Sequence, residues 1–588
     1  MTGDSLFGPS VEPGGATFRL WAPGAKRVEL VADRIHAMPR ADGEGWFALT
    51  APDAKPGTLY KFRIDGDIEV PDPASRFQPQ DVNGPSELID PNGYAWRTHT
   101  WVGRPWHECV FLELHPGTFT AEGTFRAIVA KLDHVAAAGF TAIELMPVAD
   151  FAGRWNWGYD GVLLYAPDSA YGRPEDLKAL IDAAHARGLM VFLDVVYNHF
   201  GPEGNYLGRY APQFFMPADT PWGSAINYEN ATVRRFAIEN ALYWLDEFRF
   251  DGLRLDAVHA IAEPSRTVLL TELSKQVGRL ATETGRHIHL VLENDANQAA
   301  LLDPTTEPPA GKERAQWNDD YHHAFHVLLT GETAGYYADY RDAQRHLTRA
   351  LSAGFAYQGE PSSHRNGAAR GETTAQLPAT AFVNFLQNHD QIGNRARGER
   401  LSGLAPAAPL EAAIAITLLA PPPPLMFMGD EWGAREPFPF FCDFHGELAD
   451  AVREGRTREF AEAYARHRNN IPDPLAEQTV RLATLDWTAL QRPEHAARLD
   501  LVSRLLAARK TFITPRLPRL RAGQDQATLE NGRLAARWPL EGGEAIVLLA
   551  NLGGQPQPNT WNAGEPIWGT PAAFAFAPWS VHAAIETR

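Results

Sequence analysis

Cysteine is scarce in this chain. Only Cys109 and Cys442 occur among 588 residues, and no Cys-x-x-Cys pair is present. Two isolated cysteines do not make the disulfide framework that stabilises small secreted domains. A chain of this length is long enough to bury several apolar cores instead, and hydrophobic residues make up 44% of it.

Positive charge and long apolar runs are also scarce. The chain has 54 Lys and Arg against 72 Asp and Glu, which gives a formal net charge of −18. Nucleic-acid or anionic-membrane binding calls for clustered basic residues, so we expect neither partner. No apolar run reaches the ~18 residues that span a bilayer, and the first residues lack a basic and then apolar signal region. We therefore expect a cytoplasmic protein, acting as a monomer or a weak homodimer.

Glycine-rich phosphate-binding turns are absent as well. Neither G-x-G-x-x-G nor G-x-x-x-x-G-K-[ST] occurs in the sequence. Strand-like and helix-like segments alternate from about Cys109 onward, a pattern that predicts a parallel sheet. An open doubly wound sheet usually carries such a turn after an early strand. Its absence favours a closed (β/α)8 TIM barrel.

Short alternating strands flank this region on both sides. They predict an N-terminal β-sandwich, immunoglobulin-like and similar to glycan-binding modules, over residues 1–98, and a C-terminal all-β domain over residues 521–588. The barrel with inserted loops is expected over residues 99–520. Its sixth strand is ambiguous, because either Ala315–Trp317 or the segment 325–329 fits the pattern.

Three carboxylates lie just past short apolar runs, and they carry the chemistry of this chain. Asp256, Glu293 and Asp390 each follow a strand-like segment. Strands that end on the same rim would bring these distant residues together. Like charges in a cleft push their pKa values apart, which gives one ionised and one protonated carboxyl. A glycoside hydrolase needs that pair beside the bond it cuts.

Four segments resemble the alpha-amylase family of glycoside hydrolases, in the order that the family shows. They are DVVYNH at 194–199, GLRLDAV at 252–258, LEND at 292–295 and QNHD at 387–390. The segment FRLWAP at 18–23 resembles the N-terminal sandwich of branching and debranching members. One matching segment alone would be weak evidence for the family, whereas all four together are specific for it. The resemblance implies a retaining glycoside hydrolase.

Finer features resemble one subfamily, the maltooligosyltrehalose trehalohydrolases. They are WNWGYDG at 155–161, ENDAN at 293–297, QWNDDYHH at 316–323 and QNHDQIGNR at 387–395. This resemblance implies cleavage of the α-1,4 bond next to the terminal trehalose unit of an α-glucan oligosaccharide, releasing trehalose and a maltooligosaccharide. Two alternatives stay open: a 1,4-α-glucan branching enzyme or related transglycosidase, and a non-catalytic α-glucan-binding protein. Branching enzymes usually carry Glu-Asp after the glutamate and Ser-His-Asp in the fourth segment, and this chain departs from both.

The family resemblance also implies roles for individual residues. Asp256 is expected to be the nucleophile, Glu293 the general acid and base, and Asp390 the residue that holds the distorted sugar. Arg254, two residues before Asp256, points to the same side of its strand and favours the ionised carboxylate. The residues expected to bind substrate are Arg254, His199, His389, Tyr159, Trp157, Asp160, Asn388 and Arg395.

Two features could indicate a metal, and neither is sufficient. Asn198 matches the asparagine that binds calcium in some amylases, but no further ligands can be placed. His322 and His326 have helical spacing, yet no H-E-x-x-H helix or third ligand accompanies them. We therefore expect no metal and no cofactor.

Overall fold

A closed barrel of parallel strands forms the centre of the computed structural model, which describes residues 6–220, 223–461, 471–559, 564–569 and 575–587. Each strand pairs in parallel with its two neighbours. In barrel order the strands are β9 (Phe111–Leu114), β10 (Ala142–Leu145), β13 (Met190–Val195), β16 (Gly252–Leu255), β17 (His289–Leu292), β18 (Ala315–Trp317), β21 (Phe382–Phe385) and β22 (Pro424–Phe427). The predicted TIM barrel is confirmed, and its sixth strand is Ala315–Trp317, whereas residues 325–329 belong to a helix.

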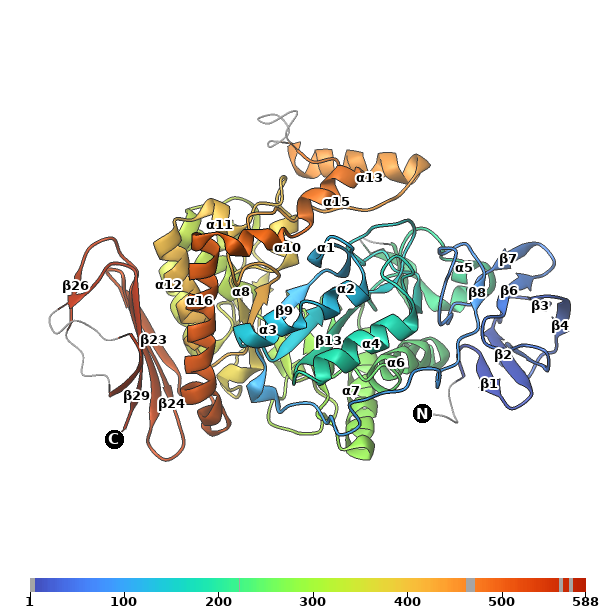
Figure 1. The fold of residues 1–588 in the computed structure, drawn as a ribbon, viewed down its shortest axis with the longest axis horizontal. Coiled ribbons are helices and arrows are strands. Elements are labelled where there is room, and N and C mark those ends of the chain that lie inside the picture. Colours follow the sequence, from blue (N-terminus) through green and yellow to red (C-terminus); the bar gives the residue numbers. More distant parts are fainter. Residues whose placement is uncertain (1–5, 221–222, 462–470, 560–563, 570–574, 588) are drawn as a thin grey trace.

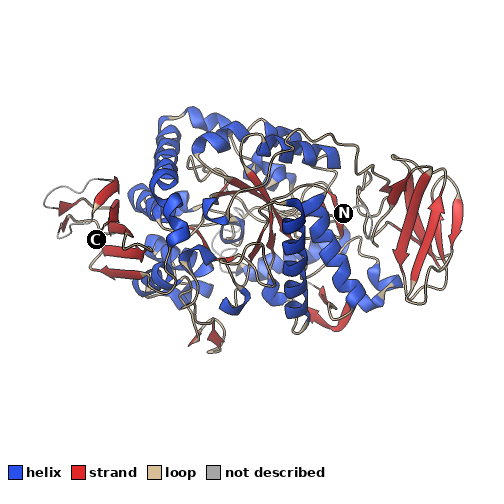
Figure 2. Ribbon diagram, turned by 90° about the horizontal axis from the view of Figure 1, so that it is seen from below, coloured by secondary structure: helices blue, strands red, loops and turns tan. Residues whose placement is uncertain are grey.

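Helices surround the strands in a ring, as Figure 2 shows. The main ones are α2 (Phe125–Val129), α3 (Leu132–Ala138), α4 (Pro174–His185), α6 (Ala231–Asp246), α7 (Ser265–Thr284), α8 (Asp319–Thr330), α9 (Ala343–Ala353), α12 (Ala407–Leu419) and α16 (Pro493–Ala508). Helix α12 is apolar around most of its circumference and buried along most of its length. Such a helix needs cover on both sides, and the neighbouring helices α16 and α8 and the C-terminal sheet provide it.

The N-terminal sandwich consists of two antiparallel sheets. One has β1 (Ser10–Glu12), β2 (Gly15–Trp21) and β5 (Trp46–Ala51), and the other has β3 (Val28–Val31), β4 (Ile35–Met38), β6 (Leu59–Ile64) and β7 (Ile68–Val70), with β8 (Ser86–Glu87) pairing with β6. The segment before β1 anchors the sandwich to the barrel, because the Phe7 ring meets Phe236 of α6 at a centroid distance of 5.0 Å. The amide of Gly24 also donates to the carbonyl of Tyr210 at 2.9 Å.

The C-terminal domain is all-β, as the sequence predicts, and lies at the opposite end of the molecule (Figure 1). Its main sheet has the order β23 (Gln526–Glu530), β24 (Arg533–Pro539), β25 (Ala545–Asn551), β29 (Ser580–Glu586) and β27 (Glu565–Trp568), and β26 (Gln557–Pro558) pairs with β28 (Ala575–Phe576). The buried Trp538 donates its indole N–H to the carbonyl of Leu351 in α9 at 3.1 Å. This contact joins the sheet to the helical ring.

Insertions build up the rim at the carboxyl ends of the strands. The short elements of the insertions are α1 (Pro116–Phe119), β11 (Ala149–Asp150), β12 (Leu163–Pro167), α5 (Leu207–Tyr210), β14 (Phe215–Thr220), β15 (Gly223–Ile226), β19 (Glu360–Pro361), β20 (Ala369–Arg370), α10 (His389–Gly393), α11 (Leu401–Leu404), α13 (Gly446–Glu459) and α15 (Glu477–Ala483). In Figure 1, α13 and α15 stand above the barrel on the side of α10 and α11. Within the described ranges, no helix combines the length and apolar character needed to cross a membrane.

Candidate active site

Arg254, near the end of β16, connects three carboxylates. Its side chain is completely buried. Nη1 donates to Asp194 Oδ2 at 2.7 Å and to Asp256 Oδ1 at 2.8 Å, and Nη2 donates to Glu293 Oε2 at 2.7 Å. The guanidinium lies 4.2 Å above the centroid of the Trp317 ring, so its face is covered as well. A single rigid fork thus holds Asp256 and Glu293 side by side on the same rim.

Both oxygens of Asp256 accept hydrogen bonds. Arg254 reaches Oδ1, and the amide of Asn198 donates to Oδ2 at 2.6 Å. Only 12% of the Asp256 side chain is exposed. A carboxylate fixed through both oxygens by donors is oriented and kept as an acceptor, which suits a nucleophile that must act as an anion.

Glu293 sits in a different environment. Its Oε2 accepts from Arg254 Nη2 and from the backbone amide of Ala257 at 2.9 Å. Ala257 has a left-handed backbone (φ 39°), which is uncommon for alanine and turns its N–H toward Glu293. Burial and the nearby Asp256 charge raise the pKa of Glu293, against the opposing effect of Arg254. Both hydrogen bonds fall on Oε2, so Oε1 is the oxygen suited to carry the proton of a general acid.

Asp390 is the most open of the three predicted catalytic carboxylates, with 36% of its side chain exposed. It lies in the first turn of α10, and its backbone amide donates to the capping side chain of Asn388 at 2.9 Å. Burial raises the pKa of Asp390, while the nearby His389 lowers it. The structure brings Asp390 to the rim that holds Asp256 and Glu293, because α10 follows the carboxyl end of β21 while those two residues follow β16 and β17.

Several residues predicted to bind substrate are engaged by the protein itself. Tyr159 donates its hydroxyl hydrogen to Asp194 Oδ2 at 2.5 Å, and the hydroxyl oxygen lies 2.8 Å from His389 Nε2. His199 Nε2 lies 2.9 Å from the carbonyl of Tyr159. Asp160 accepts from the amide of Asn156 at 2.7 Å. These contacts place the group beside the carboxylates, where direct contact with substrate remains a prediction.

Trp157 and Arg395 have less access than the sequence suggests. Trp157 is 4% exposed, and its ring stacks on Phe438 at 5.2 Å, so one face is covered by protein. Arg395 donates from both Nη atoms to Glu332, at 2.7 and 3.1 Å. Glu332 also contacts His326 Nε2 at 2.8 Å. The described residues include no group of three or more His, Cys, Asp or Glu side chains able to hold a metal.

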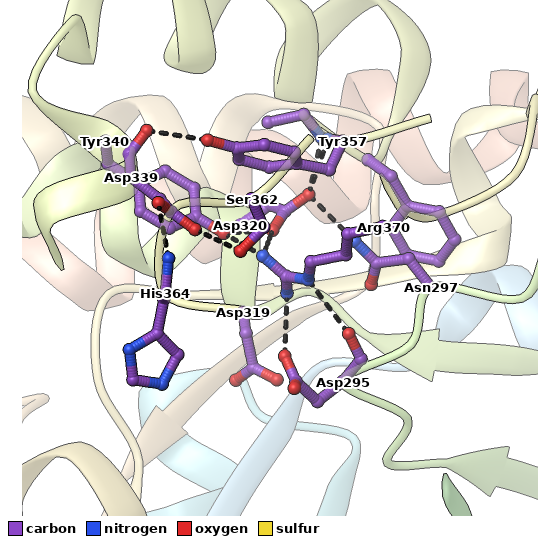
Figure 3. Close-up of polar contacts among 12 residues, drawn as sticks. Asp295, Asn297, Asp319, Asp320, Asp339, Tyr340, Tyr357, Ser362, His364 and Arg370 are labelled. Carbon is purple, nitrogen blue, oxygen red and sulfur yellow. Dashed lines mark hydrogen bonds and ion pairs between the residues drawn. The ribbon is translucent and has the colours of Figure 1, made fainter. Parts of the chain in front are cut away.

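A network of ion pairs and hydrogen bonds around Arg370 of β20 and Asp320 of α8 lies along one side of the rim (Figure 3). No sequence pattern indicates this arginine. Arg370 pairs with Asp295 Oδ1 and with Asp320 Oδ1, both at 3.0 Å. Asp320 Oδ2 accepts from the amide of Asn297 at 3.0 Å and from the backbone of Ala356 at 2.6 Å. The segments after β17 and β18 are thereby fixed to the long insertion that precedes β21.

Asp319 lies next to this network and points away from it in Figure 3. Burial raises the pKa of Asp319 well above its usual range, and the charges of Glu293, Asp295 and Asp390 add to this. Asp319 is thus a further carboxyl on the rim, with a raised pKa. It lies two residues after the end of β18, within the segment 316–323 that the sequence analysis singles out.

A parallel barrel with an arginine-bridged carboxylate pair on its C-terminal rim defines a glycoside hydrolase of the alpha-amylase class. Comparison with protein families agrees. The family "alpha amylase, catalytic domain" matches residues 76–213, and carbohydrate-binding module 48 (isoamylase N-terminal domain) matches residues 6–92. A domain of unknown function matches residues 522–582.

Curated relatives identify the family within this class. Malto-oligosyltrehalose trehalohydrolase from Deinococcus radiodurans is 43% identical over 512 residues, covering 86% of this chain and 83% of that protein. The enzyme of the same name from Saccharolobus solfataricus is 41% identical and covers 82% and 83%. The chain belongs to the malto-oligosyltrehalose trehalohydrolase family. A 1,4-alpha-glucan branching enzyme from Methylococcus capsulatus is 34% identical, but over only 45% of this chain.

Solved structures share the whole architecture. A putative alpha amylase from Salmonella typhimurium superposes with a TM-score of 0.93 at 44% identity, covering 98% of this chain and 99% of that one. A pullulanase from Paenibacillus barengoltzii in complex with maltohexaose and alpha-cyclodextrin has a TM-score of 0.73 at 18% identity, covering 100% and 96%. The second likeness concerns the fold alone.

Proposed function

We propose that this protein is a retaining hydrolase that cuts the α-1,4 bond next to the terminal trehalose unit of maltooligosyltrehalose. The products are trehalose and a maltooligosaccharide, so the reaction contributes to trehalose formation. The observation that carries the proposal is the shared guanidinium of Arg254, which sets Asp256 and Glu293 side by side in different environments. Relatives that carry the trehalohydrolase name over most of this chain support the specificity.

In the first step, a carboxylate oxygen of Asp256 attacks the anomeric carbon of the glucose unit next to trehalose. The proton on Glu293 Oε1 moves to the glycosidic oxygen as the bond to that oxygen breaks, and trehalose leaves as an alcohol. A glycosyl ester on Asp256 remains. The neighbouring negative charges, including Asp390, stabilise the positive charge that develops on the sugar ring.

In the second step, Glu293 is ionised and takes a proton from a water molecule, which attacks the anomeric carbon from the face that trehalose has left. The ester bond to Asp256 breaks, and its carboxylate returns to the hydrogen bonds of Arg254 and Asn198. Two inversions at the same carbon give a maltooligosaccharide whose new reducing end has the α configuration.

The remaining features of the proposal come from the sequence. We propose an α-glucan oligosaccharide as the partner, without nucleic acid or membrane, and a cytoplasmic monomer or weak homodimer that needs no cofactor. Size-exclusion chromatography with light scattering checks the state of association. Activity measured after dialysis against a chelator checks whether the enzyme needs a metal, and we expect no loss of activity.

Chromatography of the products from trehalose-capped maltopentaose tests the proposal. We expect free trehalose and a maltooligosaccharide, released faster than any product from an uncapped oligosaccharide of the same length. Amylose serves as the second substrate. Formation of α-1,6 branch points without trehalose release would establish the branching enzyme instead, and glucan binding without any sugar release would establish a binding protein.

A further inference from the structure

A chain of hydrogen bonds runs from β9 to β16 near the carboxyl ends of the barrel strands. It begins at Glu113, a buried residue of β9 whose Oε2 accepts the backbone amide of His389 at 3.2 Å. Glu113 Oε1 contacts His389 Nδ1, and His389 Nε2 lies 2.8 Å from the hydroxyl of Tyr159. The hydroxyl of Tyr159 donates to Asp194, which accepts from Arg254 through the same oxygen.

The hydrogen bonds on both sides of the His389 ring bear on its protonation. Tyr159 has one hydroxyl hydrogen, and it goes to Asp194 Oδ2 at 2.5 Å. Its oxygen must therefore accept from His389 Nε2, which requires hydrogen on that nitrogen. Glu113 Oε2 accepts the backbone amide of His389, and Oε1, as a carboxylate oxygen, accepts from His389 Nδ1 when that nitrogen carries hydrogen. With hydrogen on both ring nitrogens, every hydrogen bond of this chain has one donor and one acceptor, which is the arrangement of an imidazolium.

The protonation of Asp194 does not alter this conclusion. Burial raises the pKa of Asp194 to about 7. A proton on this residue would occupy Oδ1, which has no hydrogen-bond partner among the described residues. Oδ2 remains the acceptor for Tyr159 and Arg254 in either state.

We propose that Glu113 is a positioning residue for the hydrolytic reaction: it holds His389 as an imidazolium, and through Tyr159 and Asp194 this cation fixes Arg254, Asp256 and Glu293. This inference extends the proposed function and rests on it for its kinetic consequences. Glu113 acts only through other side chains, because it is buried and its two carboxyl oxygens contact the backbone amide and the Nδ1 of His389.

The charges around His389 are consistent with this state. Burial lowers its pKa, but Glu113 and Asp390 raise it more strongly, to about 9, against a smaller opposing effect of Arg254. Two further titratable groups interact electrostatically with the ring. Burial lowers the pKa of His115 to about 4, and burial raises that of Glu144, on β10, well above its usual range.

Glu144 offers a matched control. It is the direct neighbour of Glu113 across the β9–β10 pair and is equally buried. In the part of the chain that the structure describes, no donor reaches either of its carboxyl oxygens. Substitution by glutamine therefore removes a carboxyl at the same level of the barrel without breaking a link of the chain.

Nitrogen NMR of histidine-labelled protein tests the charge state without turnover. At pH 7.5 we expect both ring nitrogens of His389 to show imidazolium shifts in the wild-type protein, with the signals assigned through their loss in His389→Gln. They should also do so in Glu144→Gln. In Glu113→Gln the ring should become neutral, because an amide cannot compensate its charge. A neutral ring in the wild type, or an imidazolium in Glu113→Gln, would overturn the proposal.

Kinetics on the capped oligosaccharide give the second readout. In Glu113→Gln we expect kcat to fall about tenfold or more while KM changes less than about threefold, since the lost hydrogen bond is charged and acts on the reacting groups. Glu144→Gln should stay within about twofold of wild type in both constants. Glu113→Asp keeps the charge at a greater distance from the ring and should recover part of kcat.

The two readouts separate this inference from the proposed function. If the wild-type protein shows an imidazolium but releases no trehalose, the proposed function is contradicted and the charge state inferred for His389 is supported. Normal trehalose release with unchanged kcat in a folded Glu113→Gln variant would remove the positioning role and leave the function standing. If Glu113→Gln does not fold, Glu113→Asp replaces it. Its shorter side chain should lower both the NMR pKa of His389 and kcat, and a wild-type kcat in that variant would remove the positioning role.

Discussion

Arg254 shows how one residue sets the geometry of the candidate catalytic pair. Burying a guanidinium costs several kcal/mol unless carboxylates compensate it in good geometry. Here Asp194, Asp256 and Glu293 do so at 2.7–2.8 Å. The planar fork directs two nitrogens at two different carboxylates, which a lysine ammonium cannot do with the same rigidity. The arrangement of nucleophile and acid thus depends on this side chain, together with the donors Asn198 and Ala257 from the adjacent loops.

The roles of Asp256 and Glu293 can be separated with α-maltosyl fluoride, whose leaving group needs no protonation. In Glu293→Gln we expect a burst of about one equivalent of fluoride followed by a stall, because no base activates water for the second step. In Asp256→Asn we expect no burst, since no glycosyl ester can form. Both variants should lose several orders of magnitude of kcat on the capped oligosaccharide. A fluoride electrode records the burst, and a burst in Asp256→Asn would contradict the assignment.

The protonation of Glu293 predicts the pH dependence on the alkaline side. Its pKa is raised by burial, so the acid form persists above the usual range of a glutamate. As pH rises through that pKa the proton is lost, and kcat/KM for the capped oligosaccharide should fall about tenfold per pH unit. The fluoride burst rate of the wild type should not fall over the same range. Parallel losses for both substrates would assign the alkaline limb to another group.

At the scale of elements, strand ends were predictable and long-range pairs were not. Asp256 and Glu293 directly follow β16 and β17, because a short apolar run followed by a charged residue marks a buried strand that opens onto the rim. Glu113 and Glu144 lie inside strands whose letters, FLEL and AIEL, resemble ordinary alternation. Their neighbours come from distant strands, so nothing local reveals their burial.

The same limit applies to substrate contacts. The sequence predicts that Arg395 binds substrate, yet its fork is occupied by Glu332 from the segment after α8. The partner lies 63 positions away and carries no motif. Arg370 was missed for the same reason, since β20 belongs to an insertion whose sequence has no regular period, whereas its partners Asp295 and Asp320 lie in segments that the sequence singles out. Motif order therefore predicted the fold and the rim, whereas pairing across insertions required the structure.

The turn before Tyr159 gives a prediction at this scale. Gly158 has φ 102°, and a Cβ there would lie 2.1 Å from the carbonyl oxygen of Pro147. Gly158→Ala should displace Tyr159 from Asp194 and His389, and we expect kcat to fall at least about tenfold, which corresponds to roughly 1.4 kcal/mol. Steady-state kinetics provide the measurement. Gly403→Ala, in α11 with no described atom within 4 Å of the new Cβ, should be neutral, and equal activity of both variants would refute the role of the turn.

At the scale of the whole molecule, two all-β domains lie at opposite ends of the molecule, with the barrel between them (Figures 1 and 2). The C-terminal sheet covers α12 and α9, which explains why α12 is apolar on nearly every side. The N-terminal sandwich contacts α6 through Phe7 and the segment at Tyr210 through Gly24. The C-terminal sheet therefore completes the core, and its loss should unfold the barrel rather than only detach a module.

Trp538 tests that dependence. It is completely buried between the sheet and α9. Trp538→Ala should destabilise the protein by about 3–5 kcal/mol through the lost burial and the cavity. Trp568→Ala, on the edge strand β27 of the same sheet and partly exposed, should cost about 1 kcal/mol or less. Chemical denaturation followed by circular dichroism measures both, and a separate early transition for the C-terminal domain would contradict the single core.

The configuration of the newly released maltooligosaccharide tests the central claim most directly, namely that a sugar passes to Asp256 and then to water at one barrel rim. Proton NMR of a reaction run with enough enzyme to outpace mutarotation resolves the anomeric signals. We expect the α signal of the new reducing end to appear first and the β signal to follow only at the rate of mutarotation. A β signal that appears first would show a single displacement by water and would contradict the claim.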